Sequence, residues 1–422
     1  MSGEIWQAGE YNVLEANWML AGGNTIGVAQ QIESFVIYED LYKPFTSASV
    51  VMLDTYDLPG ELGQFGRDLF KLKVETPGLP KDTQIEMIFM VESIDRRVMR
   101  NDRLQSYVLN LIQVEYAQDL HRTISKTFTG TGDEITEKML REYMQSTLPF
   151  NKEGSTKQIK YTSNFWSPIK NIEYCKLHSI SAKNSPLYFF YNSRKGFNYH
   201  SLDYLVSQPL FQRFVGSDYI TDVDTNVNAI SLGETRRSPN KDWPVFLDLK
   251  LEKLFDYTRI HQAGGFKSDL VTHDLLTKKY KNIRWQGDQD TRTKLNPNFG
   301  YTPETYATAG AVRVTSSRYY NNHDLQDVTD SKFLQRRHST FADLLQYKVQ
   351  IDVLGRTDYT VGQKVYLDVN RPIPIRKDEG DIKDYLLSGH YIITSISHQF
   401  ARAGHVATIE LSKDSTIGIR KI

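Results

Sequence analysis

Apolar and polar residues alternate in short runs near both ends of this chain, and that alternation constrains the fold more than any other feature. Residues 70–75 read FKLKVE, and residues 347–353 read YKVQIDV. A period of two places one set of side chains in a core and the other in water, as in a half-buried β-strand. Turn signals such as Pro77-Gly78 separate the runs. The pattern therefore predicts a compact antiparallel barrel or sandwich in each region.

The two β regions also share an order of parts. The segment GRDLFKLKV (66–74) corresponds to GQKVYLDV (362–369), and FMVESIDR (89–96) corresponds to YIITSISH (391–398). LQSYVLNLI and HVATIELS follow as closing strands, and the apolar strands VVML and QIDVL come first. Any two antiparallel β segments look alike at this level, but we favour a duplicated barrel within one chain. In a trimer, two such barrels per chain would present six quasi-equivalent units around one axis.

The middle of the chain changes period. Thr131 and Glu134 form a capping-box pattern before a helical run, and Ser167-Pro168 is typical of another helix start. An aromatic hairpin is expected to turn between Ser193 and Gly196. Residues 263–334 are rich in Asn, Asp, Thr and Tyr and show few periodic runs, so we expect a loop-rich insertion there.

The predicted fold class is therefore mainly β with α+β parts. Two similar antiparallel, tube-type β-barrel domains are expected, together with an α+β domain and a loop-rich inserted domain. The expected limits are 1–118 for the first barrel, 119–225 for the α+β domain, 226–262 with 335–422 for the second barrel, and 263–334 for the insertion.

Composition narrows the function. Lys plus Arg and Asp plus Glu both number 51, which argues against a protein whose affinity rests on neutralising many phosphates. A single cysteine, Cys175, excludes an intramolecular disulfide and CxxC metal motifs. The N-terminal residues do not read as a signal peptide, and no apolar run approaches the length of a membrane span, so we expect assembly in a reducing cytoplasm. The 25 Tyr and 20 Phe are typical of strands and interfaces.

Several metal-like patterns fail on their spacing. The run Asp222 to Asn226 resembles the start of a calcium loop, but Val227 stands where the turn needs glycine, so we expect a polar linker. His390 and His398 are separated by eight strand residues, or roughly 26 Å, and cannot share a metal. His398 and His405 could meet across a hairpin, yet two ligands do not make a zinc site, so we expect surface histidines.

Enzymatic patterns fail as well. Gly130-Thr131-Gly132 precedes a helix but lacks the remainder of a phosphate loop. Cys175 has no evident base, and Glu39-Asp40 is one acidic pair among 51 carboxylates, expected on a solvated strand edge. We therefore predict no enzyme, no catalytic, cofactor-binding or metal-binding residue, and no cofactor; a cell-wall hydrolase is the weakest alternative.

The aromatic residues of the insertion leave one rival reading open. Tyrosine and tryptophan side chains bind sugars by stacking, which would suit a receptor-binding or cell-wall-binding face. Aromatic residues are equally used as interface anchors, which is the reading we favour. The residues concerned are Trp285, Tyr301, Tyr306, Tyr319 and Tyr320.

Several segments, taken in order, resemble one known family. FVIYEDLYKPFTSASVVMLDTYDLP with FGRDLFKLKVETPG is similar to the opening barrel of baseplate hub proteins from T-even-like contractile-tailed bacteriophages. VEYAQDLHRTISKTFTG and the stretch from TSNFWSPIKNIEYC to FNYHSLDYLV resemble that family's second domain. VFLDLKLEKLFDYTRIHQ, LLQYKVQIDVLGRTDYTVGQKVYLDV and GHYIITSISHQFARAGHVATIELSKDS resemble the later segments. The resemblance covers most of residues 26–280 and 333–415.

The resemblance implies a structural protein of the virion tail baseplate. It implies a homotrimer whose two barrels per chain form a pseudo-sixfold ring, joining the hexameric tail tube to a trimeric central spike. The expected partners are the spike protein, the tail tube protein and baseplate wedge or other hub-associated proteins. Neither sequence-specific nucleic-acid contact nor stable membrane insertion is expected. The hub of another contractile injection system is a near alternative, which the absence of an appended needle at the C-terminal end makes less favoured.

Overall fold

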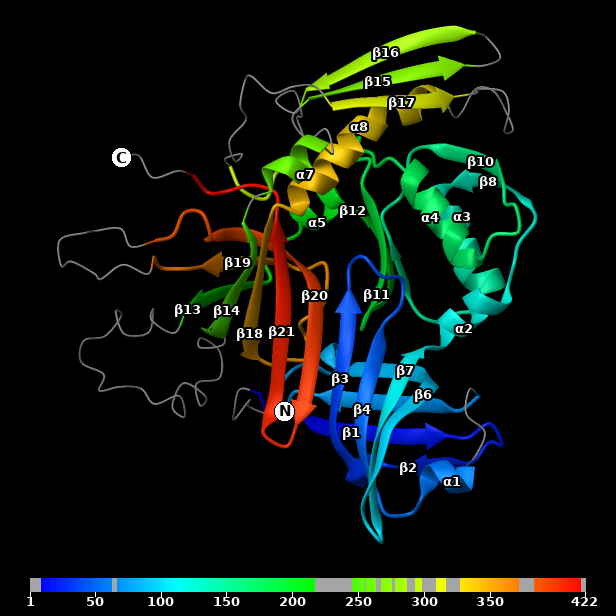
Figure 1. Cartoon of the computed structure of the whole chain (residues 1–422), viewed down its shortest axis with the longest axis vertical. Helices are drawn as coiled ribbons and strands as arrows, with labels where there is room; N and C mark the ends of the chain where they lie inside the picture. The colour runs from blue at the N-terminus through cyan, green and yellow to red at the C-terminus, as the bar shows by residue number, and fades with distance from the viewer. Residues whose placement is uncertain are drawn as a thin grey trace, which may run out of the picture.

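The fold is seen in a computed structural model, which describes residues 9–62, 67–216, 245–254, 256–262, 267–274, 278–286, 293–297, 309–315, 327–371 and 383–418. A 13-stranded sheet dominates the described part of the chain and folds into two β-units that lie side by side (Figure 1). Three smaller sheets and several helices surround it.

The first β-unit follows from the alternating pattern of its strands. In β4 every second residue is buried, and Phe70, Leu72 and Val74 of β5 point into the same core. The order of the strands is β3-β4-β7-β6-β5-β1-β2. The elements are β1 (Asn12–Met19), β2 (Thr25–Gly27), β3 (Ile32–Asp40), β4 (Ser47–Asp54), α1 (Leu58–Leu62), β5 (Leu69–Glu75), β6 (Ile85–Asn101) and β7 (Leu104–Gln113).

The second β-unit closes into a six-stranded barrel in the order β19-β13-β14-β18-β21-β20, with β20 returning to β19. Its strands are β13 (Gln212–Gly216), β14 (Val245–Leu254), β18 (Tyr347–Leu354), β19 (Lys364–Asp368), β20 (Gly389–Ala401) and β21 (Gly404–Lys413). Strand β13 runs parallel to both of its neighbours, whereas the other pairs are antiparallel. The predicted fold class, mainly β with barrel domains, is confirmed.

The repeat that the sequence suggested is present in the strand pairing. Strands β3, β4, β5, β6 and β7 are matched in chain order by β14, β18, β19, β20 and β21. Each antiparallel pair of the first unit has its counterpart in the second: β3–β4 with β14–β18, β4–β7 with β18–β21, β7–β6 with β21–β20, and β6–β5 with β20–β19. One chain therefore contains the same strand arrangement twice.

The irregularities of the two units also coincide. The β6–β7 ladder shifts register between Val91 and Ser93, and the β20–β21 ladder shifts between Ile393 and Ser395. Both shifts lie just before the Ser-Ile pair that the two sequences share. The β3–β4 and β14–β18 ladders likewise shift at matching places, after Ile32 and after Phe246. Because a bulge fixes the local twist and register of a strand, the match extends to the detailed geometry of the sheet.

An α+β region with its own apolar core lies beside the two β-units (Figure 1). The predicted capping box is present, since Glu134 accepts a hydrogen bond from the Thr131 N–H. The predicted hairpin turns between Ser193 and Gly196. The elements are α2 (Val114–His121), β8 (Thr127–Thr131), α3 (Gly132–Lys138), a π-helical turn (Met139–Tyr143), β9 (Phe150–Lys152), β10 (Gln158–Thr162), α4 (Pro168–His178), β11 (Tyr188–Ser193), β12 (Gly196–Ser201) and α5 (Leu202–Ser207).

Within residues 263–334 the described segments contain a three-stranded sheet and the start of a long helix, which the sequence pattern did not reveal. The sheet has the order β16-β15-β17 and lies at one end of the molecule (Figure 1). The elements are β15 (Lys267–Asp274), β16 (Lys279–Gln286), β17 (Ala309–Thr315) and α8 (Asp327–Leu344), preceded by α7 (Tyr257–Gln262). None of the helices described here combines the length and apolarity that crossing a bilayer requires.

Candidate assembly site: the joint of the two β-units and its open edges

Strand β20 connects the two β-units, because it pairs with a strand of each. Its first residues, 389–392, pair with β19 of the second unit, and residues 395–401 pair on the same edge with β3 of the first unit. Its opposite edge pairs with β21 along nearly its whole length. The two units are therefore joined edge to edge through backbone hydrogen bonds, which fixes their relative position.

Two histidines lie buried at this joint, and the expectation that they are surface residues is wrong. His398 and His405 have no exposed surface, and the Nδ1 atom of His398 lies 3.1 Å from the Nε2 atom of His405. The ring of His405 stacks on Phe400 with centroids 4.0 Å apart. Burial lowers the pKa of His398 to about 3 and holds the pKa of His405 well below its usual value. Both rings are therefore neutral at physiological pH.

Glu39, at the end of β3, is also buried rather than solvated, so the expectation of an exposed acidic strand edge is wrong for this residue. Its carboxylate accepts hydrogen bonds from the Thr360 hydroxyl at 2.6 Å, the Val361 N–H at 3.2 Å and the Arg194 N–H at 2.8 Å. Burial raises the pKa of Glu39, while these donors and the charge of Arg194 oppose the rise. The carboxylate thus connects three parts of the chain: the first unit, the second unit and the α+β region.

Arg194 completes this connection from the tip of the β11–β12 hairpin. Its guanidinium donates to the carbonyl oxygen of Asp82 in the first unit and to that of Asp358 in the second. Burial lowers the pKa of Arg194, and the nearby carboxylates of Glu39 and Asp358 counteract that effect. The side chain and the backbone of one residue therefore contact both β-units.

One long strand edge of the second unit is open. Strand β14 pairs with β13 only through Val245 and Phe246. Beyond them, no strand in the described part of the chain pairs with that edge of residues 247–254. Leu247 and Leu251 are 44% and 45% exposed, although apolar side chains on every second residue are typical of a covered strand. An open edge of this length is a template for pairing with another chain.

A second open edge lies on the first unit. Strand β5 pairs with β6 only as far as Met90, so the edge of residues 93–101 carries no partner strand among those described. Val98 and Met99 are 53% and 64% exposed on this projecting half of the β6–β7 hairpin (Figure 1). Both edges present unpaired backbone groups with which a strand of another chain could pair.

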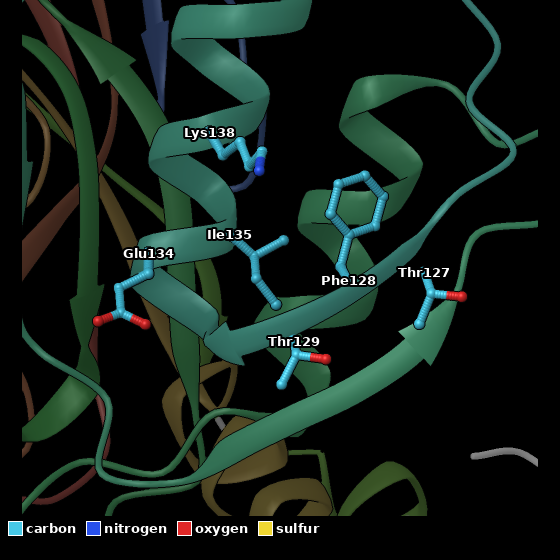
Figure 2. A pocket seen from close by; sticks show the side chains of 6 residues that line it. All are labelled: Thr127, Phe128, Thr129, Glu134, Ile135 and Lys138. Carbon is cyan, nitrogen blue, oxygen red and sulfur yellow. The ribbon is translucent and has the colours of Figure 1, made fainter.

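A shallow pocket of about 320 Å³ lies between β8 and α3 in the α+β region. Figure 2 shows its six lining side chains, which are Thr127, Phe128, Thr129, Glu134, Ile135 and Lys138. The pocket lies at the Gly130-Thr131-Gly132 turn that the sequence analysis rejected as a phosphate loop. The carboxylate of Glu134 occupies the helix start and accepts from the Thr131 N–H at 2.9 Å, which puts a negative charge where a phosphate would bind. The pocket lacks the character of an anion site.

The remaining candidates show no catalytic constellation. Cys175 is fully buried in the core of the α+β region, and burial raises the pKa of its thiol to about 12. Among the described residues, no group of three metal-ligating side chains gathers. The calcium-like run, residues 222–226, lies outside the described residues, as do Tyr301, Tyr306, Tyr319 and Tyr320. Trp285 lies on β16 and is partly buried.

The buried polar residues of the joint could have been found from the sequence. Glu39 continues the period-two face of Phe35 and Ile37, and His398 lies on the face of Ile396 and Phe400. A polar residue in register with a buried apolar face is expected to be buried with it. The alternation that predicts the two strands extends to these residues and is the signal of their burial.

Comparison with known proteins supports the fold but shows no family. No protein-family model and no curated protein matches the sequence. The tail protein from Neisseria meningitidis MC58 is similar in structure, with a TM-score of 0.55 and 11% identity over 96% of this chain and 97% of that one. The 43 kDa tail protein of prophage MuSo2 from Shewanella oneidensis has a TM-score of 0.54 and 9% identity over 95% of this chain and 99% of that one. This chain has the fold of these two tail proteins over nearly its whole length.

Proposed function

We propose that this chain is the structural hub of a contractile-tail baseplate, acting as a homotrimer in the virion after assembly in the host cytoplasm. Three copies would present six similar β-units in a ring, which would adapt a hexameric tail tube to a trimeric central spike. The hub would serve without catalysis, and its partners would be the tube protein, the spike protein and the surrounding baseplate proteins.

The observation that carries this proposal is the duplicated β-unit. A symmetric trimer of a chain with one β-unit has only threefold repetition, whereas two matched units joined edge to edge allow pseudo-sixfold repetition. The matching bulges support near-equivalence of the two units, since the register shifts fall at corresponding residues. The fold shared with two tail proteins is consistent with a place in a tail.

The joint supports the same role. A ring that transmits force between a spike and a tube must hold its units in a fixed relation. Glu39 and Arg194 hold the two units and the α+β region through hydrogen bonds, of which those from Thr360 and Val361 to the Glu39 carboxylate are buried. Hydrogen bonds to buried charged groups are stronger than neutral ones and are costly to break.

Electron microscopy of the purified chain, viewed down the particle axis, tests the proposal. We expect a ring of three chains with a sixfold outline, and a mass measurement that gives a trimer at micromolar concentration. The spike protein of the same tail should bind one end of that ring. A chain that stays monomeric at micromolar concentration, both alone and with the spike protein, would refute the proposed hub.

A further inference from the structure

Two open edges among the described strands, on β14 and on β6, are the counterparts of two edges that already pair with each other inside the chain. Within one chain, β3 of the first unit pairs with the far half of β20 of the second unit. The counterpart of β3 is β14, and the counterpart of β20 is β6. In the part of the chain that the structure describes, neither counterpart has a partner strand along the corresponding stretch, which is residues 247–254 of β14 and 93–101 of β6.

The correspondence of β14 to β3 holds residue by residue. Phe35 of β3 is opposite Val50, and Leu249 of β14 is opposite Ile351, the residue that corresponds to Val50 in the second unit. Leu249 therefore takes the place of Phe35. With this alignment of the two strands, the register shift after Ile32 of β3 falls at the same place as the shift after Phe246 of β14.

The correspondence of β6 to β20 is equally definite. Met99 is opposite Gln105 in the first unit, as Phe400 is opposite His405 in the second. Met99 therefore takes the place of Phe400. The exposed fractions of the two side chains differ because only one has a neighbouring strand. Phe400, which pairs with β3, is 1% exposed, whereas Met99, on the open edge, is 64% exposed.

We propose that β6 of one copy pairs antiparallel with β14 of the next copy, in the register of the β3–β20 joint. The occupant of each open edge is a second copy of this chain, because the chain itself carries the complementary edge in the required geometry. The contact is heterologous, since the two edges differ, and such contacts form a ring when the rotation closes. The closure at three copies rests on the proposed function; the pairing of the edges does not.

The register places apolar residues opposite each other. Since Phe35 is opposite Phe400 inside the chain, Met99 faces Leu249 between chains. By their positions in the ladders, Ile94 of β6 corresponds to Ile396 of β20, and Leu254 of β14 corresponds to Glu39 of β3. Since Ile396 is opposite Glu39 inside the chain, Ile94 faces Leu254 between chains. Cross-strand apolar pairs of this kind stabilise a sheet.

The charges and bulges of the two edges are complementary as well. The same counting places Asp95 opposite Lys253. The β6 ladder has an additional shift between Asp95 and Val98, and the β14 ladder has one between Leu251 and Lys253. The extra residues are Arg96-Arg97 on one strand and Glu252 on the other. Arg97 already pairs with Asp57 in its own chain, so Arg96 is the residue brought to Glu252 with opposite charge.

Cysteine cross-linking measures this register directly. Paired residues in an antiparallel ladder have Cα atoms about 4.5–5.5 Å apart, within the range that a disulfide spans. The Met99→Cys/Leu249→Cys double variant is therefore expected to form disulfides between chains on mild oxidation. Mixing the two single variants should give cross-linked dimers only, because each chain then carries one reactive cysteine. The native Cys175 is buried and provides an internal negative control.

A variant pair that is shifted by one residue controls for simple proximity. In Met99→Cys/Lys250→Cys the second cysteine lies on the opposite face of β14, so we expect about tenfold less cross-linked product than from the matched pair. Equal yields from the two pairs would overturn the proposed register. A native chain that is trimeric by mass but gives no disulfide from the matched pair would overturn the edge pairing while leaving the hub function standing. Disulfide-linked chains that never close into a trimer would support the pairing and contradict the hub.

A charge exchange gives a second measurement that needs no disulfide. Asp95→Lys or Lys253→Asp alone puts like charges opposite each other and is expected to weaken self-association roughly two- to fivefold. The double variant restores opposite charges and is expected to recover the native association constant, measured by analytical ultracentrifugation at low salt. Additive weakening in the double variant would contradict the proposed contact.

Discussion

Phe35 of β3 and Phe400 of β20 stack nearly face to face across the joint of the two β-units, with ring centroids 4.5 Å apart and planes 15° from parallel. Each is 1% exposed. The ring of Tyr11 packs edge-on against Phe400, with ring centroids 5.1 Å apart. The ring of His405 also stacks on Phe400. The contact between the two units is therefore an aromatic core of its own, in addition to a backbone ladder.

Replacing Phe400 with alanine is expected to destabilise the protein by about 3–5 kcal/mol, because it removes a buried ring and leaves a cavity between the units. Chemical denaturation at matched protein concentrations measures the change in the free energy of unfolding. Phe165→Ala is the control, since Phe165 is 70% exposed and its loss is expected to change stability by no more than about 0.5 kcal/mol. Equal effects of the two substitutions would show that the joint contributes little.

Glu39→Ala is expected to destabilise the protein by about 3–5 kcal/mol, because it leaves the buried donors of Thr360, Val361 and Arg194 without their acceptor. The same denaturation experiment measures this loss. Glu33→Ala on the same strand provides the control, as Glu33 is only partly buried and its removal is expected to cost about 0.5 kcal/mol or less. A small effect at Glu39 would mean that the carboxylate is not what holds the three parts together.

Gly355→Ala tests how tightly the joint is packed around His405. A Cβ atom at Gly355 would clash with the imidazole ring of His405. That ring stacks on Phe400, and the backbone N–H of His405 donates to the carbonyl oxygen of Gly9. We expect a loss of about 1–3 kcal/mol from this overpacking, seen as a lower Tm. Gly22→Ala is the matched control, because nothing lies within 4 Å of a Cβ atom there. A Gly355→Ala protein with native Tm would show that His405 can move aside.

Alternation predicted the strands of the two β-units because burial of one sheet face leaves a direct record in the sequence. Four matched segments were enough to identify the repeat, and the strand pairing confirms it. The counterpart of β3 was harder to recognise from sequence. In β14 the apolar residues Leu249 and Leu251 alternate with charges, but the insertion separates this strand from the rest of its unit.

Other parts of the fold have no residue pattern from which they could be predicted. Strands β15–β17 form a small sheet, and runs such as KSDLVTHD and KYKNIRWQ mix apolar and polar residues without strict alternation. The pairing of the two units at β3 and β20 could not be predicted from sequence for a different reason. Tertiary packing, and not the local residue pattern, decides which edge of one unit pairs with the other. The open edges of β14 and β6 become apparent only when the pairing of every neighbouring strand is known.

The histidine pair makes the joint sensitive to acid. Both imidazoles are neutral in the folded protein because burial depresses their pKa values, to about 3 for His398, while an unfolded chain would titrate them near 6.5. Arg194 adds a positive charge that opposes protonation of His398, whereas a hydrogen bond to the backbone of Tyr359 favours it, and the ring of Tyr11 lies 6.5 Å from that of His405. A group with a depressed folded-state pKa contributes stability above its unfolded pKa and loses it as the pH falls.

The free energy of unfolding is therefore expected to fall as the pH is lowered from about 6.5 towards 4, with each buried imidazole adding up to about 1.4 kcal/mol per pH unit to the slope. His398→Gln and His405→Gln should each reduce that slope, whatever they do to stability at pH 7. Phe165→Ala is the control, because Phe165 is exposed and carries no titratable group, so its substitution is expected to leave the slope unchanged. Comparing slopes between variants removes the contribution of other titrating groups, Glu39 included. If neither joint variant flattens the curve, the acid sensitivity resides elsewhere in the chain and the buried pair is not its source.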